Sequence, residues 1–340
     1  MGSERPANNI VFVVAESLRG DHLSLNGYER KTTPFLDDLS ERGLIHNWGI
    51  AVSNSTCSIV SHDMLLTGFR PDELPDRDES LKKVPLIFQY AKAMGYKTFY
   101  MDAQMDSIWG EMEGDGISYV DERYNSSFFY RKVKNGRDID FEIAKSIDRI
   151  TSSSSGNFIF VFKRGVHFPY KNSFPEEAAV WKPSFDGSPV DASPEEQAAV
   201  INSYDNGIRY NLEGFFKNLT RDYNNLPNNT VYIYTGDHGQ TLGDYGVNYP
   251  HCGVTKSEAI VPLFIIGNLQ GEVDTKFKAS HENIFATILD LMKYPDDLRK
   301  RNYAISLLKA KESDSKPRHY ASSGRSTLGE HIPSGKLKFD

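Results

Sequence analysis

The sequence contains only two cysteines, Cys57 and Cys252, among its 340 residues. A fold that is held together by disulfides needs several pairs, so we expect no disulfide framework in this protein. Stability must instead come from a buried core, and a chain of this length can form a large one.

Long apolar runs are also missing. No stretch approaches the roughly 18 apolar residues that a membrane-spanning helix needs, and the first residues, MGSERPANN, lack the apolar segment of a signal peptide. We expect residues 1–8 to be a cloning scar or linker and residues 9–340 to form a single soluble domain. An upstream membrane region is expected to have been removed.

The sequence also has no excess of basic residues. Lysine and arginine total 39 against 46 aspartates and glutamates, which gives a formal net charge of -7. A protein whose main partner is nucleic acid usually carries a basic surface, so we expect no nucleic-acid partner.

Five apolar, β-branched runs alternate with segments of helical pattern. The runs are residues 9–15, 96–102, 157–163, 230–236 and 261–267. The helical segments include residues 32–43, 84–95, 193–221 and 280–292. This alternation is typical of an α/β fold with a central, mostly parallel sheet flanked by helices on both faces.

Two of the helical segments carry start signals. Thr33 precedes Pro34, which suits the first position of a helix, and Gly43 follows as a stop. Ser193 and Glu196 have the spacing of a capping box, so the longest helix should begin there.

Polar side chains that can ligate a metal collect where the expected strands end. Glu16 ends the first run and His167 follows the third. Asp237 and His238 follow the fourth run, and His251 comes a little later. In an open α/β sheet, ligands bind outside the carboxyl ends of the strands. Singly these residues also fit a salt bridge or a turn, but together they supply the oxygen and nitrogen ligands that zinc prefers.

A nucleophile is expected in residues 53–68, SNSTCSIVSHDMLLTG, where polar residues precede an apolar run of helical character. A side chain at the start of a helix meets backbone N–H groups and a favourable dipole for a phosphate anion. The alternative interpretation is an ordinary serine or threonine N-cap.

In order along the chain come the motifs VVAESLRGDHLSLNGYERKTTP, SNSTCSIVSHDMLLTG, INSYDNGI, YTGDHGQTLGDYG and VPLFIIG. This series resembles that of lipid A and related phosphoethanolamine transferases, in the sulfatase branch of the alkaline phosphatase superfamily. The resemblance covers residues 9–295 and implies an alkaline-phosphatase-like, sulfatase-type α/β fold for a single catalytic domain.

The resemblance also implies one zinc, held by Glu16, Asp237, His238 and the side-chain oxygen of the nucleophile. His167 and His251 would lie around the transferred phosphate. There they could bind its oxygens, protonate the departing group, or hold a second zinc at high metal concentration. A zinc at this place lowers the pKa of the nucleophilic hydroxyl and neutralises charge on the phosphoryl oxygens.

Thr56, Cys57 and Ser58 compete for the role of nucleophile. Many members of the family use threonine, which favours Thr56, whereas sulfatases use a modified cysteine, which favours Cys57. Aligning SNSTCSIVS without gaps on the family's Ser-Cys-Gly-Thr-Ser-Thr-Ala-x-Ser places Ser58 on the reacting threonine and keeps Ser61 on the serine three residues later. Counting back from LLTG at residues 65–68 gives the same register. We therefore predict Ser58 as nucleophile and zinc ligand, with Thr56 as second choice.

The implied function is transfer of phosphoethanolamine from a phospholipid such as phosphatidylethanolamine to a glycan or lipid acceptor, through a covalent phospho-enzyme. A phosphodiesterase or a phosphoglycerol transferase would use the same centre, and a third possibility is an inactive domain that binds a phosphorylated ligand. The resemblance further implies a monomer at the periplasmic face of the bacterial inner membrane, which it reaches through a missing N-terminal region.

The sequence departs from the family pattern at two points. The stretch CSIVSH lacks the proline and the arginine of the sulfatase signature Cys-x-Pro-Ser-Arg, so hydrolysis of sulfate esters is not expected. Lipid A transferases usually carry several disulfides and an N-terminal membrane region, and neither is evident in this sequence.

Other polar residues have less specific interpretations. Residues 19–22 are interpreted as a structural turn. His62 lies one turn past Ser58 and fits either the phosphate site or a packed helix. Gln104 fits a solvated loop better than a head-group contact, and Cys252 is expected to pack as a small apolar residue.

Overall fold

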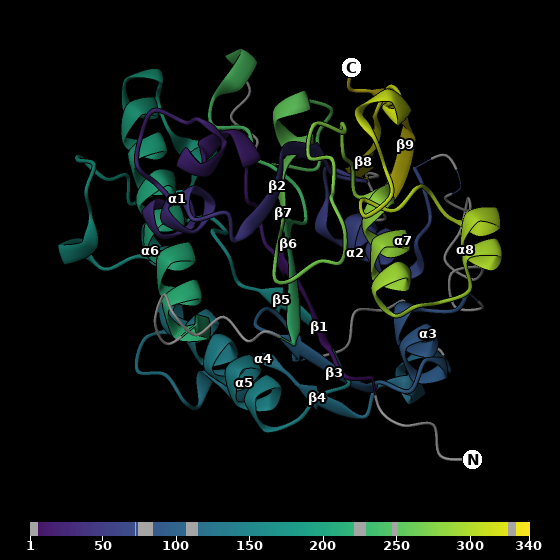
Figure 1. Cartoon of the computed structure of the whole chain (residues 1–340). Coiled ribbons are helices and arrows are strands. Elements are labelled where there is room, and N and C mark those ends of the chain that lie inside the picture. Colours follow the sequence, from purple (N-terminus) through teal and green to yellow (C-terminus); the bar gives the residue numbers. More distant parts are fainter. Residues whose placement is uncertain are drawn as a thin grey trace.

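A computed structural model of the chain describes residues 6–71, 73, 84–106, 115–220, 229–246, 251–325 and 331–340. Residues 1–5 of the expected scar or linker and residue 221 of the expected longest helix lie outside these described residues. The described chain folds around a central sheet that has helices on both sides (Figure 1).

The central sheet has seven strands within the described residues, in the order β2-β7-β6-β1-β5-β3-β4. The strands are β1 (Asn9–Ala15), β2 (Ile45–Val52), β3 (Lys97–Asp102), β4 (Glu122–Tyr124), β5 (Asn157–Lys163), β6 (Thr230–Gly236) and β7 (Ile260–Ile266). Strand β7 runs antiparallel to its neighbours β6 and β2, whereas the pairs from β6 through β1, β5 and β3 to β4 are parallel. The prediction of a mostly parallel sheet is confirmed.

The five strands expected from apolar runs are found within one residue of their predicted ends, but β2 and β4 were not predicted. In β2 the register shifts between Asn47 and Ile50, and Gly49 between them has a φ of 69°. This irregularity interrupts the pattern of a strand. Strand β4 is only three residues long, and two of its three side chains, Glu122 and Arg123, are charged.

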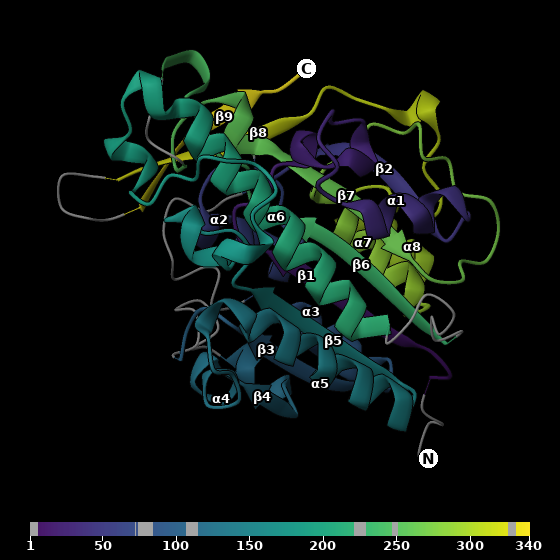
Figure 2. The ribbon, with the colours of Figure 1, turned by 90° about the vertical axis from the view of Figure 1, so that its left-hand side faces the viewer.

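Eight helices flank the sheet in the described part of the chain. They are α1 (Pro34–Glu41), α2 (Ser58–Thr67), α3 (Ile87–Ala93), α4 (Ser126–Tyr130), α5 (Ile139–Ser153), α6 (Gln197–Thr220), α7 (Glu282–Leu291) and α8 (Asp296–Asn302). Helices α1, α5 and α6 share one hydrophobic core with the sheet, and α2, α3 and α7 share the other. Figure 2 shows α6 lying across the face that it covers, with the strands behind it.

The central strand β1 contributes to both cores because its side chains alternate between the faces of the sheet. Val11 and Val13 pack in the core beside α6, whereas Ile10, Phe12 and Val14 pack in the core beside α7. All five side chains are buried, which explains why this strand is a continuous apolar run.

The predicted helix starts are found in the structure. Helix α1 begins at Pro34, and Gly43 follows its end with a φ of 70°. Ser193 and Glu196 form a capping box, in which the backbone N–H of Ser193 donates to Glu196 Oε2 at 2.9 Å. That box begins a short 3-10 turn that leads into α6, the longest described helix.

A hairpin near the C-terminus was not anticipated from the sequence. Strands β8 (His319–Arg325) and β9 (His331–Lys338) pair antiparallel in a sheet of their own. The hairpin lies near α2 and α7 in Figure 1, and β8 forms a bridge with Ser55. No described helix has both the length and the apolar character needed to cross a membrane.

Lys163, the last residue of β5, is fully buried against α6. Its Nζ donates to Asn211 Oδ1 at 2.8 Å and to the Tyr234 hydroxyl at 3.0 Å, and it stands 4.1 Å from the centroid of the Phe215 ring. Burial lowers the pKa of its ammonium to about 8, although the charge of Asp140 acts in the opposite direction.

We expect the contribution of Lys163 to the free energy of unfolding to rise with pH between about pH 8 and its usual pKa of 10.5. In this window the unfolded chain binds more protons than the folded chain, because the pKa of the folded chain is the lower one, and stability then rises with pH. Denaturant unfolding of wild type and Lys163→Met across this window measures the effect. As the pH rises through this window, the free energy of unfolding of the wild type should increase by roughly 3 kcal/mol relative to that of the variant. A difference between the two proteins that does not depend on pH would contradict this expectation.

Candidate metal centre and active site

Three potential metal ligands meet at the carboxyl ends of two neighbouring strands. Glu16 follows β1, and Asp237 and His238 follow β6, which pairs in parallel with β1. Each residue offers a ligand atom, these atoms lie within 4.8 Å of one another, and all three residues are buried. The structure thus brings together the three predicted ligands that follow strands.

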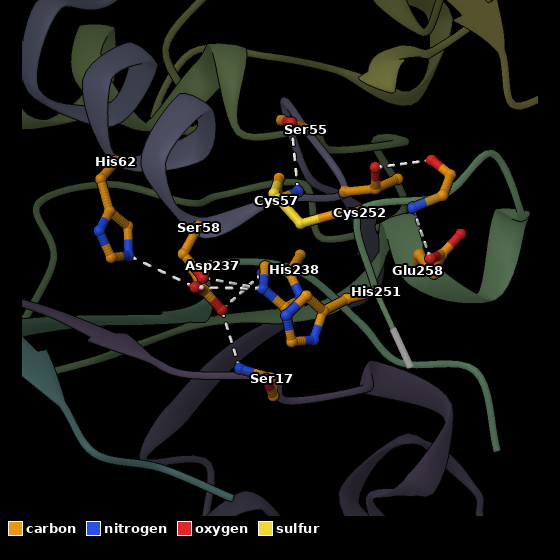
Figure 3. The surroundings of a disulfide bond; sticks show 12 residues. Ser17, Ser55, Cys57, Ser58, His62, Asp237, His238, His251, Cys252 and Glu258 are labelled. Carbon is orange, nitrogen blue, oxygen red and sulfur yellow. Dashed lines mark hydrogen bonds and ion pairs between the residues drawn. A yellow bond between two sulfur atoms is a disulfide. The ribbon is translucent and has the colours of Figure 1, made fainter. Parts of the chain in front are cut away.

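Asp237 is oriented by backbone groups. Its Oδ1 accepts hydrogen bonds from the backbone N–H of Ser17 at 2.8 Å and of His238 at 2.7 Å (Figure 3). The other oxygen, Oδ2, is buried and has no hydrogen-bond partner among the described residues. It stands 3.5 Å from His238 Nε2 and 3.4 Å from His62 Nε2. A buried carboxylate oxygen in this situation is well placed to bind a cation.

His238 is oriented in the way that is usual for a metal ligand. Its Nδ1 is 2.7 Å from the Gly239 carbonyl oxygen and donates to it. This bond turns Nε2 toward Glu16 Oε1, at 3.4 Å, and toward Ser58 Oγ, at 3.0 Å. A histidine whose second nitrogen is held by a backbone carbonyl presents the first one in a fixed direction.

The two buried carboxylates of this cluster are stabilised by positive charge beside them. Burial alone would lower the pKa of the His238 imidazole, but the charges of Asp237 and Glu16 raise it to about 9. Burial alone would raise the pKa of the Glu16 carboxyl, but its contact with His238 holds that pKa well below the usual range. Both shifts arise from the attraction between the imidazole and the carboxylates, and a divalent cation at this place would supply positive charge of the same kind.

Ser58 is the first residue of α2 and the hydroxyl nearest to these ligands among the three candidate nucleophiles. Its Oγ lies 3.2 Å from Glu16 Oε2 and 3.0 Å from His238 Nε2. The hydroxyl of Thr56 instead donates to the Gly253 carbonyl at 2.8 Å. Cys57 is bound in a disulfide. Of the three, Ser58 is the one whose reactive atom reaches the cluster.

Helix α2 is tied to the loop that carries the ligands. Ser61, one turn into the helix, donates from Oγ to the Asp237 carbonyl at 2.6 Å. The backbone N–H of Ser61 bonds the carbonyl of Cys57, the N-cap residue, at 3.0 Å. These bonds fix the start of α2 against the loop that follows β6, and Ser58 lies at this junction.

His251 and His167 face the cluster from two further loops. The ring of His251 lies 4.7 Å from the ring of His238 and 5.9 Å from that of His167, measured between centroids. His251 Nδ1 is 3.2 Å from Gln240 Oε1, and His167 Nδ1 is 2.6 Å from the Phe168 carbonyl oxygen. Burial lowers the pKa of His251 to about 3, and the neighbouring His238 acts in the same direction.

The two cysteines form a disulfide, so the expectation that Cys252 packs as a small apolar residue is wrong. Cys57 and Cys252 are 195 residues apart in sequence, yet their Cα atoms are 4.5 Å apart (Figure 3). Each cysteine adjoins a predicted site residue, Ser58 or His251. If those two residues meet, the cysteines are brought near each other, and this signal was present in the sequence.

The structure places the less specific candidates in contacts of their own. Within residues 19–22, Arg19 pairs with Asp21 at 2.7 Å, and His22 lies 2.7 Å from a carboxylate oxygen of Asp205. Gln104 Nε2 donates to the Lys163 carbonyl at 2.9 Å. His62 is packed, as one of its two alternatives predicted, and it also contacts a candidate metal ligand. Its ring stacks on Phe162 at a centroid distance of 3.8 Å, and its Nε2 faces Asp237.

Ser17 is a site residue that the sequence analysis did not identify. Its backbone N–H holds Asp237, and its Oγ donates to Glu16 Oε1 at 2.5 Å. The residue has a φ of 59°, which is uncommon for any residue other than glycine. Its position directly after Glu16 was the available signal.

Comparisons with known proteins identify the family and the fold. Residues 8–294 match the model of the sulfatase family. The chain is 24% identical over 329 residues to the Kdo(2)-lipid A phosphoethanolamine 7''-transferase of Escherichia coli K12, which covers 89% of this chain and 55% of that protein. It is 25% identical over 326 residues to the phosphatidylethanolamine transferase Mcr-2 of Escherichia coli, which covers 85% of this chain and 54% of that protein.

A solved structure shares the fold. The crystal structure of the C-terminal periplasmic domain of EcEptC from Escherichia coli, in complex with Zn, matches with a TM-score of 0.72 and 20% sequence identity. The match covers 94% of this chain and 90% of that domain. The α/β fold implied by the resemblance is thereby confirmed. The chain spans about half the length of the two transferases that it matches.

We expect the double substitution Cys57→Ala and Cys252→Ala to lower the free energy of unfolding by about 2–4 kcal/mol, because the disulfide closes a long loop in the unfolded chain. Denaturant midpoints of the oxidised wild type and the variant measure the difference. Wild type reduced with a phosphine should behave like the variant. Equal midpoints for all three proteins would show that the bond does not stabilise the fold.

Proposed function

The chain belongs to the sulfatase family, and we propose that it is a zinc-dependent transferase that moves phosphoethanolamine from a phospholipid to a glycan or lipid acceptor. The observation that carries this proposal is the position of Ser58 Oγ, 3.2 Å from Glu16 Oε2 and 3.0 Å from His238 Nε2. A nucleophile surrounded by metal ligands at the start of a helix is suited to phosphoryl transfer.

Glu16, Asp237, His238 and the Ser58 hydroxyl would hold one zinc. Zinc bound there supplies a Lewis acid that lowers the pKa of the serine hydroxyl and neutralises charge on the phosphoryl oxygens. The residues fit such an ion for two reasons. Asp237 Oδ2 is buried without a hydrogen bond among the described residues, and the two carboxylates need a positive charge beside them.

Transfer would proceed in two displacements at phosphorus. In the first, Ser58 Oγ bonds to phosphorus while the bond from phosphorus to the diacylglycerol oxygen breaks. The proton that Ser58 loses is matched by the proton that the diacylglycerol hydroxyl gains. In the second, an acceptor oxygen bonds to phosphorus, the bond to Ser58 breaks, and the acceptor's proton is matched by the one that Ser58 regains.

His251 and His167 would act on the substrate. Their Nδ1 atoms lie against oxygen atoms of the protein, so each ring presents Nε2 with a lone pair. Such a nitrogen can take the proton of the acceptor hydroxyl and return it to a departing oxygen in the opposite step. The same two nitrogens would be the ligands of a second zinc at high metal concentration.

The donor and the place of action follow from the same proposal. A phospholipid donor such as phosphatidylethanolamine requires the site to work at a membrane surface, and we propose the periplasmic face of the bacterial inner membrane. The names of two relatives, a lipid A transferase and a phosphatidylethanolamine transferase, support a lipid substrate, and the periplasmic domain of EcEptC, which shares the fold, supports the place. A phosphodiesterase or phosphoglycerol transferase would use the same residues, with water as acceptor or glycerophosphate as the transferred group.

Mass spectrometry after incubation with phosphatidylethanolamine tests the reaction and the nucleophile together. The wild type should gain the mass of one phosphoethanolamine on the peptide that contains Ser58, and Ser58→Ala should gain none. Thr56→Ala should keep the adduct, because the Thr56 hydroxyl bonds Gly253 and not the ligand cluster. An adduct mapped to Thr56 or Cys57 would reassign the nucleophile. An adduct formed with phosphatidylglycerol alone would point to phosphoglycerol transfer.

Metal analysis tests the zinc ligands. The purified wild type should hold about one zinc per chain, and Asp237→Asn should hold far less, because an amide is a poor zinc ligand. Asp140→Asn is a matched control, since Asp140 is also buried and also accepts two backbone N–H groups, those of Arg164 and Gly165. Full zinc occupancy in Asp237→Asn would remove this residue from the metal site.

A further inference from the structure

Two loops that are distant in sequence carry the reacting groups, and they are joined directly. We call residues 54–58 the nucleophile segment and residues 251–256 the histidine loop. The backbone N–H of Cys252 donates to the Thr56 carbonyl at 2.8 Å, and the Thr56 hydroxyl donates to the Gly253 carbonyl at 2.8 Å. The disulfide from Cys57 to Cys252 adds a covalent link. The separation of Ser58 and His251 therefore depends on how these two segments are held.

The C-terminal hairpin contacts both segments. In the nucleophile segment, the N–H of Ala321 donates to the Asn54 carbonyl at 2.8 Å, and the N–H of Thr56 donates to the Ala321 carbonyl at 3.1 Å. In the histidine loop, the hydroxyl of Tyr320 donates to the Val254 carbonyl at 2.8 Å. Consecutive residues of β8 thus reach both loops.

Tyr320 is well suited to fix the distance between the loops. It is 2% exposed, and its ring packs with Val52, Ala259, Leu337 and Phe339 in a small core of its own. The ring is therefore held by the end of β2 and by β9, and the direction of its hydroxyl is set before it meets the loop. A side chain fixed in this way positions the group to which it bonds.

The rest of the histidine loop has a different anchor. Glu258 accepts from the N–H of Gly253 at 2.8 Å and from the N–H and hydroxyl of Thr255, both at 2.8 Å. These bonds hold the loop to the chain that follows it, because Glu258 lies two residues beyond its end. The bond from Tyr320 to Val254 is different, since it ties the loop to the strand that also holds Asn54 and Thr56.

We propose that Tyr320 is a positioning residue of the transfer site, which sets the distance between Ser58 and His251 by holding the histidine loop against β8. The inference rests on the proposed function, because it assigns Tyr320 a part in that reaction. It goes beyond the family match, which ends at residue 294, whereas β8 begins at His319. In this role Tyr320 acts through its bond to Val254.

Tyr320→Phe in the full chain tests this role, because it removes only the hydroxyl and keeps the packed ring. We expect kcat for head-group release to fall about tenfold, with KM and zinc content close to those of the wild type, because a displaced His251 affects the transition state more than binding. Hydrogen exchange should report the cause. Backbone amides of residues 251–256 should exchange about tenfold faster in the variant.

Tyr96→Phe is the matched control. Tyr96 is also 2% exposed, and its hydroxyl donates to Asn8 Oδ1 at 2.9 Å. It directly precedes β3, so it lies at the amino ends of the strands, opposite the site. It should leave both kcat and the exchange of residues 251–256 unchanged.

Three results would contradict the role of Tyr320. They are an unchanged kcat in Tyr320→Phe, an unchanged exchange of the histidine loop, and a loss of zinc that parallels the loss of activity. A wild type that forms no phospho-enzyme would instead overturn the proposed function. The exchange measurement would still decide in that case whether Tyr320 holds the loop.

Discussion

Two buried carboxylates, Glu16 and Asp237, stand close together at the ends of neighbouring strands, and the rest of the site compensates their charge. Burial of two acids side by side is costly unless hydrogen bonds and positive charge accompany it. Two backbone N–H groups, of Ser17 and His238, satisfy one oxygen of Asp237. The imidazole of His238 lies beside both acids, whose charges raise its pKa to about 9, and the remaining oxygen of Asp237 has no hydrogen bond among the described residues.

The order of the strands explains how distant residues reach this place. Strand β1 lies between β5 and β6, so the loops that follow all three strands converge on Glu16. At two positions in these loops the backbone approaches its neighbours so closely that only glycine fits. At Gly165, which has a φ of 59°, a Cβ atom would lie 2.4 Å from the Glu16 carbonyl oxygen. At Gly239 it would lie 2.2 Å from the Ser257 carbonyl oxygen. These two contacts bring the loops that carry His167 and His238 against their neighbours.

The parts of the structure that could be predicted are those with a strong local pattern. The buried strands are continuous apolar runs, and a ligand that follows such a run must lie at the sheet edge, so Glu16 and Asp237 could be placed from sequence. Strand β2 was missed because its bulge at Gly49 breaks the alternation. The hairpin β8–β9 was missed because it is rich in polar residues, and Tyr320 is buried only through contacts with distant segments. Such contacts leave no periodic signal in either segment.

Long-range links are needed because the proposed reacting groups lie on segments that are far apart in the sequence. Ser58 begins a helix that follows the edge strand β2, whereas His251 belongs to a loop nearly two hundred residues later, and neither segment would hold the other by local structure alone. Ordering two such loops costs conformational entropy, and a bond that spans a long separation reduces that cost most. The disulfide is one such link, and the hydrogen bonds of strand β8 to the two segments are another. Both attach within a few residues of Ser58 and His251, where a small displacement would change the geometry of the proposed transfer most. Long-range links are thus concentrated near the carboxylates that organise the site.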